Sequence, residues 1–465
     1  MKVTLRQRLG LQKGAAVNMT EGPIIKSILM FALPLFVGQL LQQLYNMVDA
    51  WVIGNFADND AFAAVSSAGS MTFLVVGLFN GISIGGGVII SKYFGAGEKE
   101  NVVKAIHTNF LFGLIASVFA TVFGLLFVPK ILQWMNIPES VMPNSLSYYG
   151  IYFAGVSTVI MYNICMSIMR ALGDSIHPLY YLMCSSAINV VLDLLFVAGL
   201  GWGVAGAATA TVIAQGVSVL LCITKMCKST EYTRLDFKKL HFYKDIMVEV
   251  IKQGLPTGIQ TSVSSIGNIV VQSNINAFGA FAMAGVGAYA KIEGFIFLPI
   301  MSMTMALPTF ISQNLGAKKY DRAKKGAKFG ILFGVITAEV LGIIFYLAAP
   351  TLLRIFLDTP ESIEFGIVHI RIIALFFFLL ALTHCSAGVL RGCGKAFIPM
   401  ATMLAFWCGV RVTYVTCALK VVPEFRMIGW AYPLTWCLSA VTLFTIVLKM
   451  DWQKAFASKK EKSNH

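Results

Sequence analysis

RALGDSIHP at residues 170–178 returns as RGCGKAFIP at residues 391–399, and each copy stands between two long apolar segments. Arginine, glycine and proline occupy the same places in both copies, which lie 221 residues apart. The same distance separates the Gly-Ala pair of YFGAG at 93–97 from that of NLGAK at 314–318. A membrane unit that is repeated within one chain is typical of secondary transporters.

The composition indicates a membrane protein. Of 465 residues, 57% are hydrophobic and only 12% are charged, about half the usual charged share, and the mean hydropathy is +0.75. Segments that can cross a hydrocarbon core of about 30 Å recur along the whole sequence. Because they are continuously apolar rather than alternating, they predict helices and not barrel strands. The twelve predicted spans are 28–52, 62–90, 106–128, 146–169, 176–198, 204–226, 253–277, 283–311, 327–349, 367–389, 397–418 and 428–449.

The net charge of +14 follows the membrane topology. If the chain starts in the cytoplasm, most Lys and Arg fall on that side, whereas Asp and Glu divide evenly. This is the positive-inside pattern, so we expect both termini in the cytoplasm. We interpret the basic loops 225–252 and 318–328 as topology determinants that contact anionic lipid, and we expect no nucleic-acid partner. Residues 1–26 run into a full-length span with no small-residue cleavage site, so we expect no cleaved signal peptide.

The predicted organisation is that of an all-α membrane protein with two pseudo-symmetric lobes of six helices. Its segments are a cytoplasmic N-terminal segment (1–23), an N-lobe (24–226), a cytoplasmic linker (227–245), a C-lobe (246–450) and a cytoplasmic tail (451–465). Because each lobe has an even number of spans, the copies are parallel repeats that enter the membrane from the same side.

Two aspartates interrupt the apolar spans of the first lobe, where a charge is costly. Asp49 lies towards the outer end of span one, and Asp193 lies in span five with Asn189 four residues earlier on the same helix face. Burial disfavours the charged carboxylate and a second carboxyl nearby disfavours it further, which favours proton binding. Oxygen side chains here would alternatively suit Na⁺. A structural reading stays open: Asp49 as an interfacial residue and Asp193 as a helix–helix hydrogen-bonding group.

The second lobe has different polar residues. Glu293 in span eight fits either a cavity-lining function or a structural pairing, and we expect Glu339 and Arg411 to be structural partners or interfacial residues. The repeat aligns Arg411 with Val190, next to Asn189, so the second lobe replaces the acidic group with a cation. Ion coupling is therefore expected mainly in the N-lobe.

Aromatic, thioether and polar side chains near a central cavity would suit flat, apolar cations. The candidates are Tyr45, Met161 and Tyr162, which also fit packing or lipid contact, together with Gln260, Gln272 and Glu293. We interpret Tyr148, Tyr149 and Tyr152, at a span end, as part of an interfacial belt.

No enzymatic or metal-binding pattern occurs in the sequence. The nine cysteines are scattered, without CxxC or a histidine at ligand spacing, so neither a structural disulfide nor a metal site is implied. No Walker A motif is present, which excludes ATP as the energy source, and no catalytic motif of a hydrolase or metalloprotease is found. We therefore expect no enzyme activity.

Several boxes together resemble one family over about residues 24–450. They are LPLFVGQLLQQLYNMVD at 33–49, the GAG and GAK boxes, the two RxxG[DK]xxxP boxes and SQNLGAKKYDRAKKG at 312–326. In combination they resemble the multidrug and toxic compound extrusion (MATE) family. An Asp in span one with N-x-x-x-D in span five is similar to the DinF-like branch.

The resemblance implies two six-helix bundles around a central cavity and an antiporter that exports organic cations and amphipathic toxic compounds against H⁺ or Na⁺, by rocker-switch alternating access. The implied cation site comprises Asp49, Asn189, Asp193 and Thr211, with Thr209 as the alternative threonine. The proline of span one that bends when the aspartate is protonated would be Pro34. The NorM-like branch places its coupling acids in spans seven and ten, where this chain has no carboxylate.

The remaining implications concern partners and location. No cofactor is implied beyond the coupling ion, and the expected partners are small amphipathic or cationic molecules and membrane lipids. We expect a monomeric multi-pass protein of a bacterial or archaeal cell membrane. The alternative functions are a flippase for a lipid-linked precursor and an exporter of an endogenous metabolite.

Overall fold

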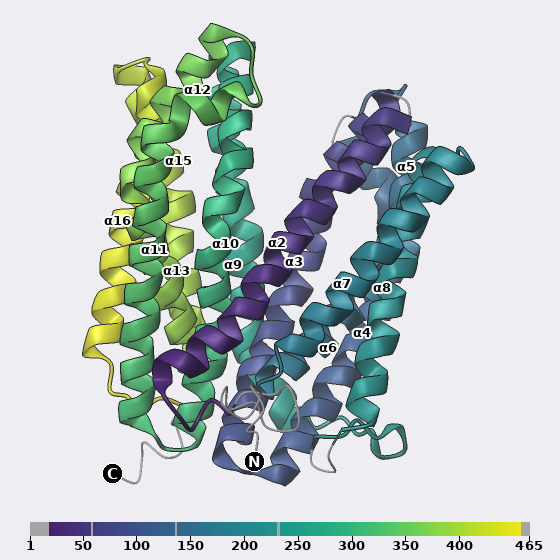
Figure 1. Cartoon of the computed structure of the whole chain (residues 1–465), viewed down its shortest axis with the longest axis vertical. Coiled ribbons are helices and arrows are strands. Elements are labelled where there is room, and N and C mark those ends of the chain that lie inside the picture. Colours follow the sequence, from purple (N-terminus) through teal and green to yellow (C-terminus); the bar gives the residue numbers. More distant parts are fainter. Residues whose placement is uncertain (1–17, 57–58, 135–136, 230–232, 457–465) are drawn as a thin grey trace, which may run out of the picture. The chain divides into compact units, whose positions relative to one another are not determined.

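The computed structural model describes residues 18–56, 59–134, 137–229 and 233–456, which form helices and no strand (Figure 1). The helices of the first half are α2 (Ile24–Phe56), α3 (Asn59–Ala96), α4 (Lys99–Trp134), α5 (Met142–Ala154), α6 (Val156–Ala171), α7 (Ile176–Asp193), η1 (Leu194–Gly199) and α8 (Gly203–Cys227). Those of the second half are η2 (Phe237–Lys239), α9 (Lys244–Asn276), α10 (Ala280–Gly316), α11 (Tyr320–Arg354), α12 (Pro360–Ile373), η3 (Ala374–Phe376), α13 (Phe377–Gly392), α14 (Phe397–Met403), η4 (Leu404–Val410), α15 (Arg411–Val421) and α16 (Phe425–Lys449).

These elements provide enough apolar length for many membrane crossings. In the described part of the chain nine helices or continuous helical groups can span a bilayer, and the bent pair α5–α6 makes a tenth. The other two long helices are α3, with 38 residues, and α9, with 33 residues. On α11, exposed apolar side chains recur at helical spacing, which suits a face in contact with lipid; they are Leu332, Ile336, Val340, Ile343 and Leu347. The all-helical membrane architecture expected from the sequence is confirmed.

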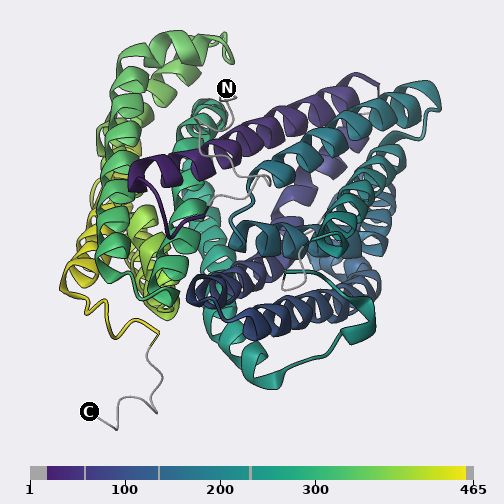
Figure 2. The same ribbon diagram turned by 60° about the horizontal axis from the view of Figure 1, so that its bottom comes forward.

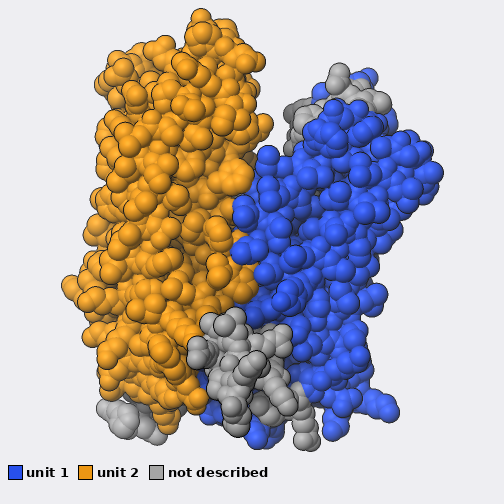
Figure 3. Space-filling model, viewed as in Figure 1, with its two compact units in different colours: residues 1–18, 37–258 blue, residues 19–36, 259–465 orange. Residues whose placement is uncertain are grey.

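The chain forms two compact units (Figure 3). Unit 1 comprises Met1–Asn18 and Val37–Gly258, and unit 2 comprises Met19–Phe36 and Ile259–His465. Both boundaries fall inside long helices, α2 and α9, each three residues after a proline, Pro34 or Pro256. Figures 1 and 2 show α2 as one continuous helix. The first turns of α2 therefore pack within unit 2, and its remainder packs within unit 1.

The duplicated arginine–glycine box forms the same helix-ending turn in both units. Gly173 and Gly394 have positive φ angles of 86° and 74°, which L-residues with a side chain rarely adopt. In both turns the glycine N–H donates to the carbonyl three residues earlier at 2.9 Å. The next N–H, of Asp174 or Lys395, donates to the carbonyl five residues earlier, at 3.0 or 2.9 Å. This is the Schellman motif, which satisfies the last carbonyls of a helix.

Four glycines allow α3 and the first half of α9 to touch backbone to backbone within unit 1. Gly81 lies against Gly258, and Gly85 lies against Gly254, so each helix contributes a Gly-x-x-x-Gly pair. A Cβ atom at Gly81 or Gly85 would overlap the backbone of α9. Small residues at this spacing are what close helix packing in a membrane requires.

Substitution of Gly85 by alanine should lower the thermal unfolding temperature of the detergent-purified protein, because the new methyl group forces α3 and α9 apart. Overpacking of this kind costs about 1–3 kcal/mol. The matched control is Gly287→Ala in α10, where a Cβ would meet nothing within 4 Å. The control should be neutral or stabilising, since alanine is the better helix former. Equal unfolding temperatures for the two variants would contradict the close contact.

Candidate functional site

A buried aspartate of α7, Asp193, and a half-buried aspartate of α2, Asp49, form an acidic site in unit 1. Asp193 is 1% exposed and is the last residue of α7, directly before the π-helical η1. Such π-helical segments often occur at functional sites. One turn beyond Asp49, Val52 and Ile53 of α2 belong to a small apolar cluster with Val197 and Ala207, which holds this part of α2 against η1 and α8.

The carboxyl groups of Asp49 and Asp193 interact directly. Two carboxyl groups can form a hydrogen bond only when one of them carries a proton, because a carboxylate has no donor. The Oδ1 atom of each aspartate is buried and accepts no hydrogen bond from any described residue. The pair therefore offers two desolvated oxygens that a proton or a metal cation would satisfy.

Asn189 and Thr211 complete the polar group around Asp193. The hydrogen-bonding surroundings favour an Asn189 amide orientation in which the nitrogen donates to Asp193 Oδ2 at 2.8 Å and the oxygen accepts from the Thr211 N–H at 3.2 Å. The reverse orientation would place Nδ2 only 3.5 Å from Thr211 Oγ1 and would leave Asp193 without this donor. Thr211 Oγ1 also lies 3.4 Å from the Tyr45 hydroxyl.

The structure distinguishes the two threonines that the sequence offered. The Thr209 hydroxyl donates to the Ala205 carbonyl at 2.7 Å, within its own helix. The Thr211 hydroxyl instead contacts Tyr45, one turn before Asp49. Asp49, Asn189, Asp193 and Thr211, the group that the resemblance implied, thus lie together on three helices, with Tyr45 beside them.

Tyr148 and Tyr152 of α5 interact electrostatically with Tyr45; the sequence placed them, with Tyr149, in an interfacial belt. Tyr149 is 0% and Tyr152 is 7% exposed, and Tyr148 interacts electrostatically with Asp49 and Tyr45. The rings of Tyr148 and Tyr152 stack at 6.2 Å. Their spacing of four residues places both rings on one helix face, and this is the only signal in the sequence that points to a shared surface.

Met161 and Tyr162 lie in the packed interior of unit 1. Met161 is 5% exposed and its sulfur packs against Gly113 of α4. Tyr162 is 7% exposed and interacts with Arg170, near the end of α6. Among the described residues, neither is found in contact with the carboxyl pair. Their positions fit packing, the alternative that the sequence left open.

Unit 2 buries a cation where unit 1 buries an acid. Arg411 is 1% exposed and donates to Thr435 Oγ1 from Nη2 at 2.9 Å and to Asn268 Oδ1 from Nη1 at 3.3 Å. Its guanidinium also lies 5.0 Å and 4.6 Å from the ring centres of Trp407 and Tyr432. Such contacts stabilise a desolvated cation.

The other polar candidates of unit 2 have separate surroundings. Glu293 is half-buried and interacts electrostatically with Arg411. Gln260 donates to the sulfur of Met403 at 2.8 Å, and Gln272 donates to Asn276 Oδ1 at 2.9 Å. Glu339 accepts the backbone N–H of Phe378 at 3.2 Å, directly after the short helix η3. That contact fits a structural role for Glu339, one of the two alternatives that the sequence left open.

Two helical units with a repeated sequence and a carboxyl pair in apolar surroundings define a multi-pass transporter of the cell membrane. A family model described as MatE matches residues 34–195 and 256–415, more than half of the chain. The chain belongs to the MatE family.

Several known proteins are similar over nearly the whole chain. The "Probable multidrug resistance protein YoeA" of Bacillus subtilis is 27% identical over 429 residues, which cover 90% of this chain and 92% of that protein. The "Multidrug export protein MepA" of Staphylococcus saprophyticus is 22% identical over 427 residues, which cover 92% of this chain and 94% of that protein. A solved structure described as "MATE in the bent conformation" has a TM-score of 0.88 at 19% identity, with 94% of this chain and 97% of that chain covered. This likeness establishes the shared fold.

Replacement of Arg411 by methionine should destabilise unit 2 by about 1–3 kcal/mol, because Thr435 and Asn268 lose the hydrogen bonds that the Arg411 guanidinium donates. The double variant Arg411→Met with Glu293→Gln should lose less free energy of unfolding than the two single variants lose in total. The difference, which is the interaction energy of the two residues, should be about 0.5–3 kcal/mol. Thermal unfolding in detergent measures both quantities. Lys420→Met, at an exposed position of the same helix α15, is the control. Strictly additive losses would show that the two charges are independent.

Proposed function

We propose that this chain is a cation-coupled multidrug antiporter that exports organic cations and amphipathic toxic compounds by alternating access. The observation that carries the proposal is the pair Asp49–Asp193, in which each carboxyl has one buried oxygen that accepts no hydrogen bond from the described residues. Membership of the MatE family and similarity to YoeA and MepA, named as multidrug resistance and export proteins, support drug efflux.

In the proposed coupling step an incoming cation neutralises the carboxyl pair. A proton shared by Asp49 and Asp193 removes their mutual repulsion and lowers the cost of desolvation. Na⁺ would act in the same way, with the carboxylate oxygens, the Asn189 amide oxygen and the Thr211 hydroxyl as candidate ligands. Either ion allows α2 to pack more closely against α7 and α8, because the electrostatic penalty at Asp49 is gone.

Helix α2 is proposed to move when the carboxyl pair is neutralised. Asp49 lies fifteen residues after Pro34, about 22 Å along the helix axis. Pro34 lacks a backbone donor and therefore weakens the helix near the point where α2 passes from unit 2 to unit 1. A shift of α2 at Asp49 would be absorbed most easily at Pro34, as a bend.

The proposed substrates are cationic because unit 2 has an accessible negative group. Arg411 is enclosed by aromatic rings and hydrogen-bonding partners, whereas Glu293 is half-buried. We therefore assign Glu293 as a contact for the positive charge of a substrate. A flippase for a lipid-linked, anionic precursor is the runner-up and would need several accessible arginines; the 1% exposure of Arg411 argues against that role for it. Export of an endogenous metabolite is the other alternative.

Asp49→Asn and Asp193→Asn should each abolish ion-driven efflux, because an amide neither binds a proton nor supplies a charge for Na⁺. Ethidium transport in proteoliposomes, with pH and Na⁺ gradients imposed separately, measures this loss and identifies the ion. Asp451→Asn, in the exposed tail, should transport normally. Undiminished transport by both site variants would refute the proposal.

Thr211→Val should separate Na⁺ coupling from H⁺ coupling. Loss of one hydroxyl ligand of a charged ion should raise the half-activating Na⁺ concentration about tenfold. The pH of half-maximal activity should stay unchanged, since a shared proton needs only the carboxyl pair. Thr209→Val is the matched control on α8, because its hydroxyl bonds its own helix. Equal behaviour of the two variants in Na⁺ would exclude Thr211 as a ligand.

A further inference from the structure

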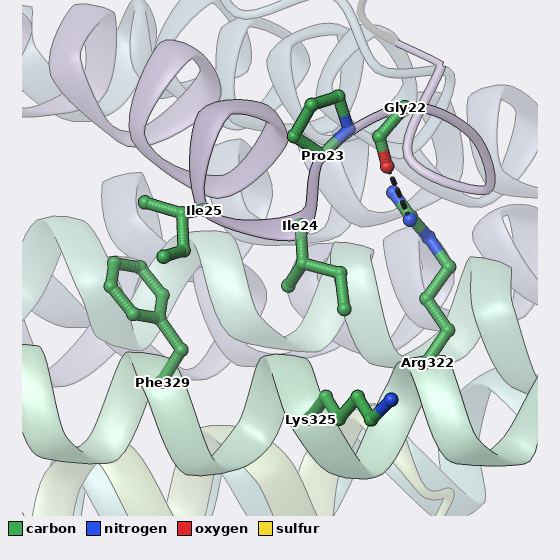
Figure 4. Close-up of a pocket in the computed structure, with 7 residues that line it drawn as sticks. All are labelled: Gly22, Pro23, Ile24, Ile25, Arg322, Lys325 and Phe329. Carbon is green, nitrogen blue, oxygen red and sulfur yellow. Dashed lines mark hydrogen bonds between the residues drawn. The ribbon is translucent and has the colours of Figure 1, made fainter.

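A hollow of about 550 Å³ lies in unit 2 between the start of α2 and the first turns of α11 (Figure 4). Ile24 and Ile25 of α2 line one wall, and Arg322, Lys325 and Phe329 of α11 line the other. In Figure 4, Phe329 and Ile25 lie at one end of the hollow, and Arg322 and the Lys325 ammonium lie at the other. The hollow therefore has an apolar end and a cationic end.

The walls of the hollow are fixed by hydrogen bonds to the segment that precedes α2. Arg322 donates to the carbonyls of Met19, Glu21 and Gly22 at 3.1, 2.7 and 2.6 Å. Lys319 donates to the Thr20 carbonyl at 2.9 Å. The start of α2 is thus held on α11 by main-chain acceptors, and the hollow is a built feature of unit 2.

The cationic end is suited to an anion that approaches from the membrane interface. Arg322 uses three of the five N–H groups of a guanidinium for these carbonyls. Lys325 is exposed and lies in the second turn of α11, where the positive end of the helix dipole adds to its charge. Glu21 interacts electrostatically with Arg322 and offsets part of its charge, so Lys325 is the main contact.

A small water-soluble anion would not contact the apolar end of the hollow. Ile25 is 53% exposed and Phe329 is half-buried, and both lie beside the cations instead of within the core. A phosphate alone would use only half of this surface. An acyl chain attached to a phosphate would use both halves, and basic pockets at the cytoplasmic side of helix bundles bind anionic lipids.

We propose that this hollow is a binding site for an anionic phospholipid, with the phosphate at Lys325 and Arg322 and an acyl chain along Phe329 and Ile25. Because the start of α2 forms one wall, a bound lipid stabilises the contact between α2 and α11. The lipid would thereby oppose any movement of the part of α2 that belongs to unit 2.

The test uses the full-length protein and native mass spectrometry of retained phosphatidylglycerol and phosphatidylcholine. The unaltered protein should retain phosphatidylglycerol in preference. Lys325→Glu should lower that retention at least about fivefold, the loss expected when one lysine near an anionic lipid is removed. The matched control is Lys324→Glu, an exposed neighbour on α11 that does not line the hollow, and its retention should be unchanged. Glu21→Gln should increase retention, because it removes the offsetting charge.

Two further measurements separate the possible ligands. Phe329→Gln should reduce phosphatidylglycerol retention without a change in charge, and millimolar inorganic phosphate should not displace the lipid. Equal losses for Lys324→Glu and Lys325→Glu, or equal retention of phosphatidylcholine by the unaltered protein, would overturn the site. Displacement by inorganic phosphate would reassign it to a soluble anion and overturn the lipid proposal. None of these outcomes involves drug transport, so they stand apart from a failure of the proposed antiport.

Discussion

The desolvation of two facing carboxyl groups is the constraint on which unit 1 depends. Asp49 and Asp193 sit among apolar helices, where two negative charges at close range are strongly unfavourable. Asn189 supplies a donor to one oxygen, but the Oδ1 atoms remain without a hydrogen bond from the described residues. The packing of α2 against η1 and α8 is therefore sensitive to whatever neutralises the pair. Under the proposed function, this dependence on bound charge couples ion binding to movement of α2.

Unit 2 also buries a charged side chain, but this charge is positive, and groups of unit 2 itself stabilise it. Arg411 is satisfied by Thr435 and Asn268 and is flanked by two aromatic rings, so its charge needs no ion from outside. The two units thus share the backbone geometry of the duplicated turns, but the buried charged residue is an aspartate in unit 1 and an arginine in unit 2. Under the proposed function, unit 1 responds to the coupling ion, and Glu293 of unit 2 contacts the substrate.

Much of this site could be predicted from sequence because its signals are local. The four-residue spacing of Asn189 and Asp193 and the rarity of charges in apolar spans mark these residues. Tertiary contacts carry no such signal. Nothing in the sequence indicates that Tyr148 lies near Asp49, or that Asn268 contacts Arg411. The sequence predicts that span seven starts at residue 253, yet α9 begins at Lys244, and Glu249 in its second turn contacts Lys92 and Tyr93 of α3.

The two Schellman turns have a consequence for how such a chain diverges over evolutionary time. Their geometry is set by a glycine and by main-chain hydrogen bonds, whereas the Asp174 side chain accepts the His177 N–H at the start of the next helix. One copy has an aspartate after the glycine and the other a lysine, with the same backbone bonds at 3.0 and 2.9 Å. After a gene duplication, each half could therefore change its charges without losing its turns. Such tolerance lets one ancestral domain give rise to two specialised ones.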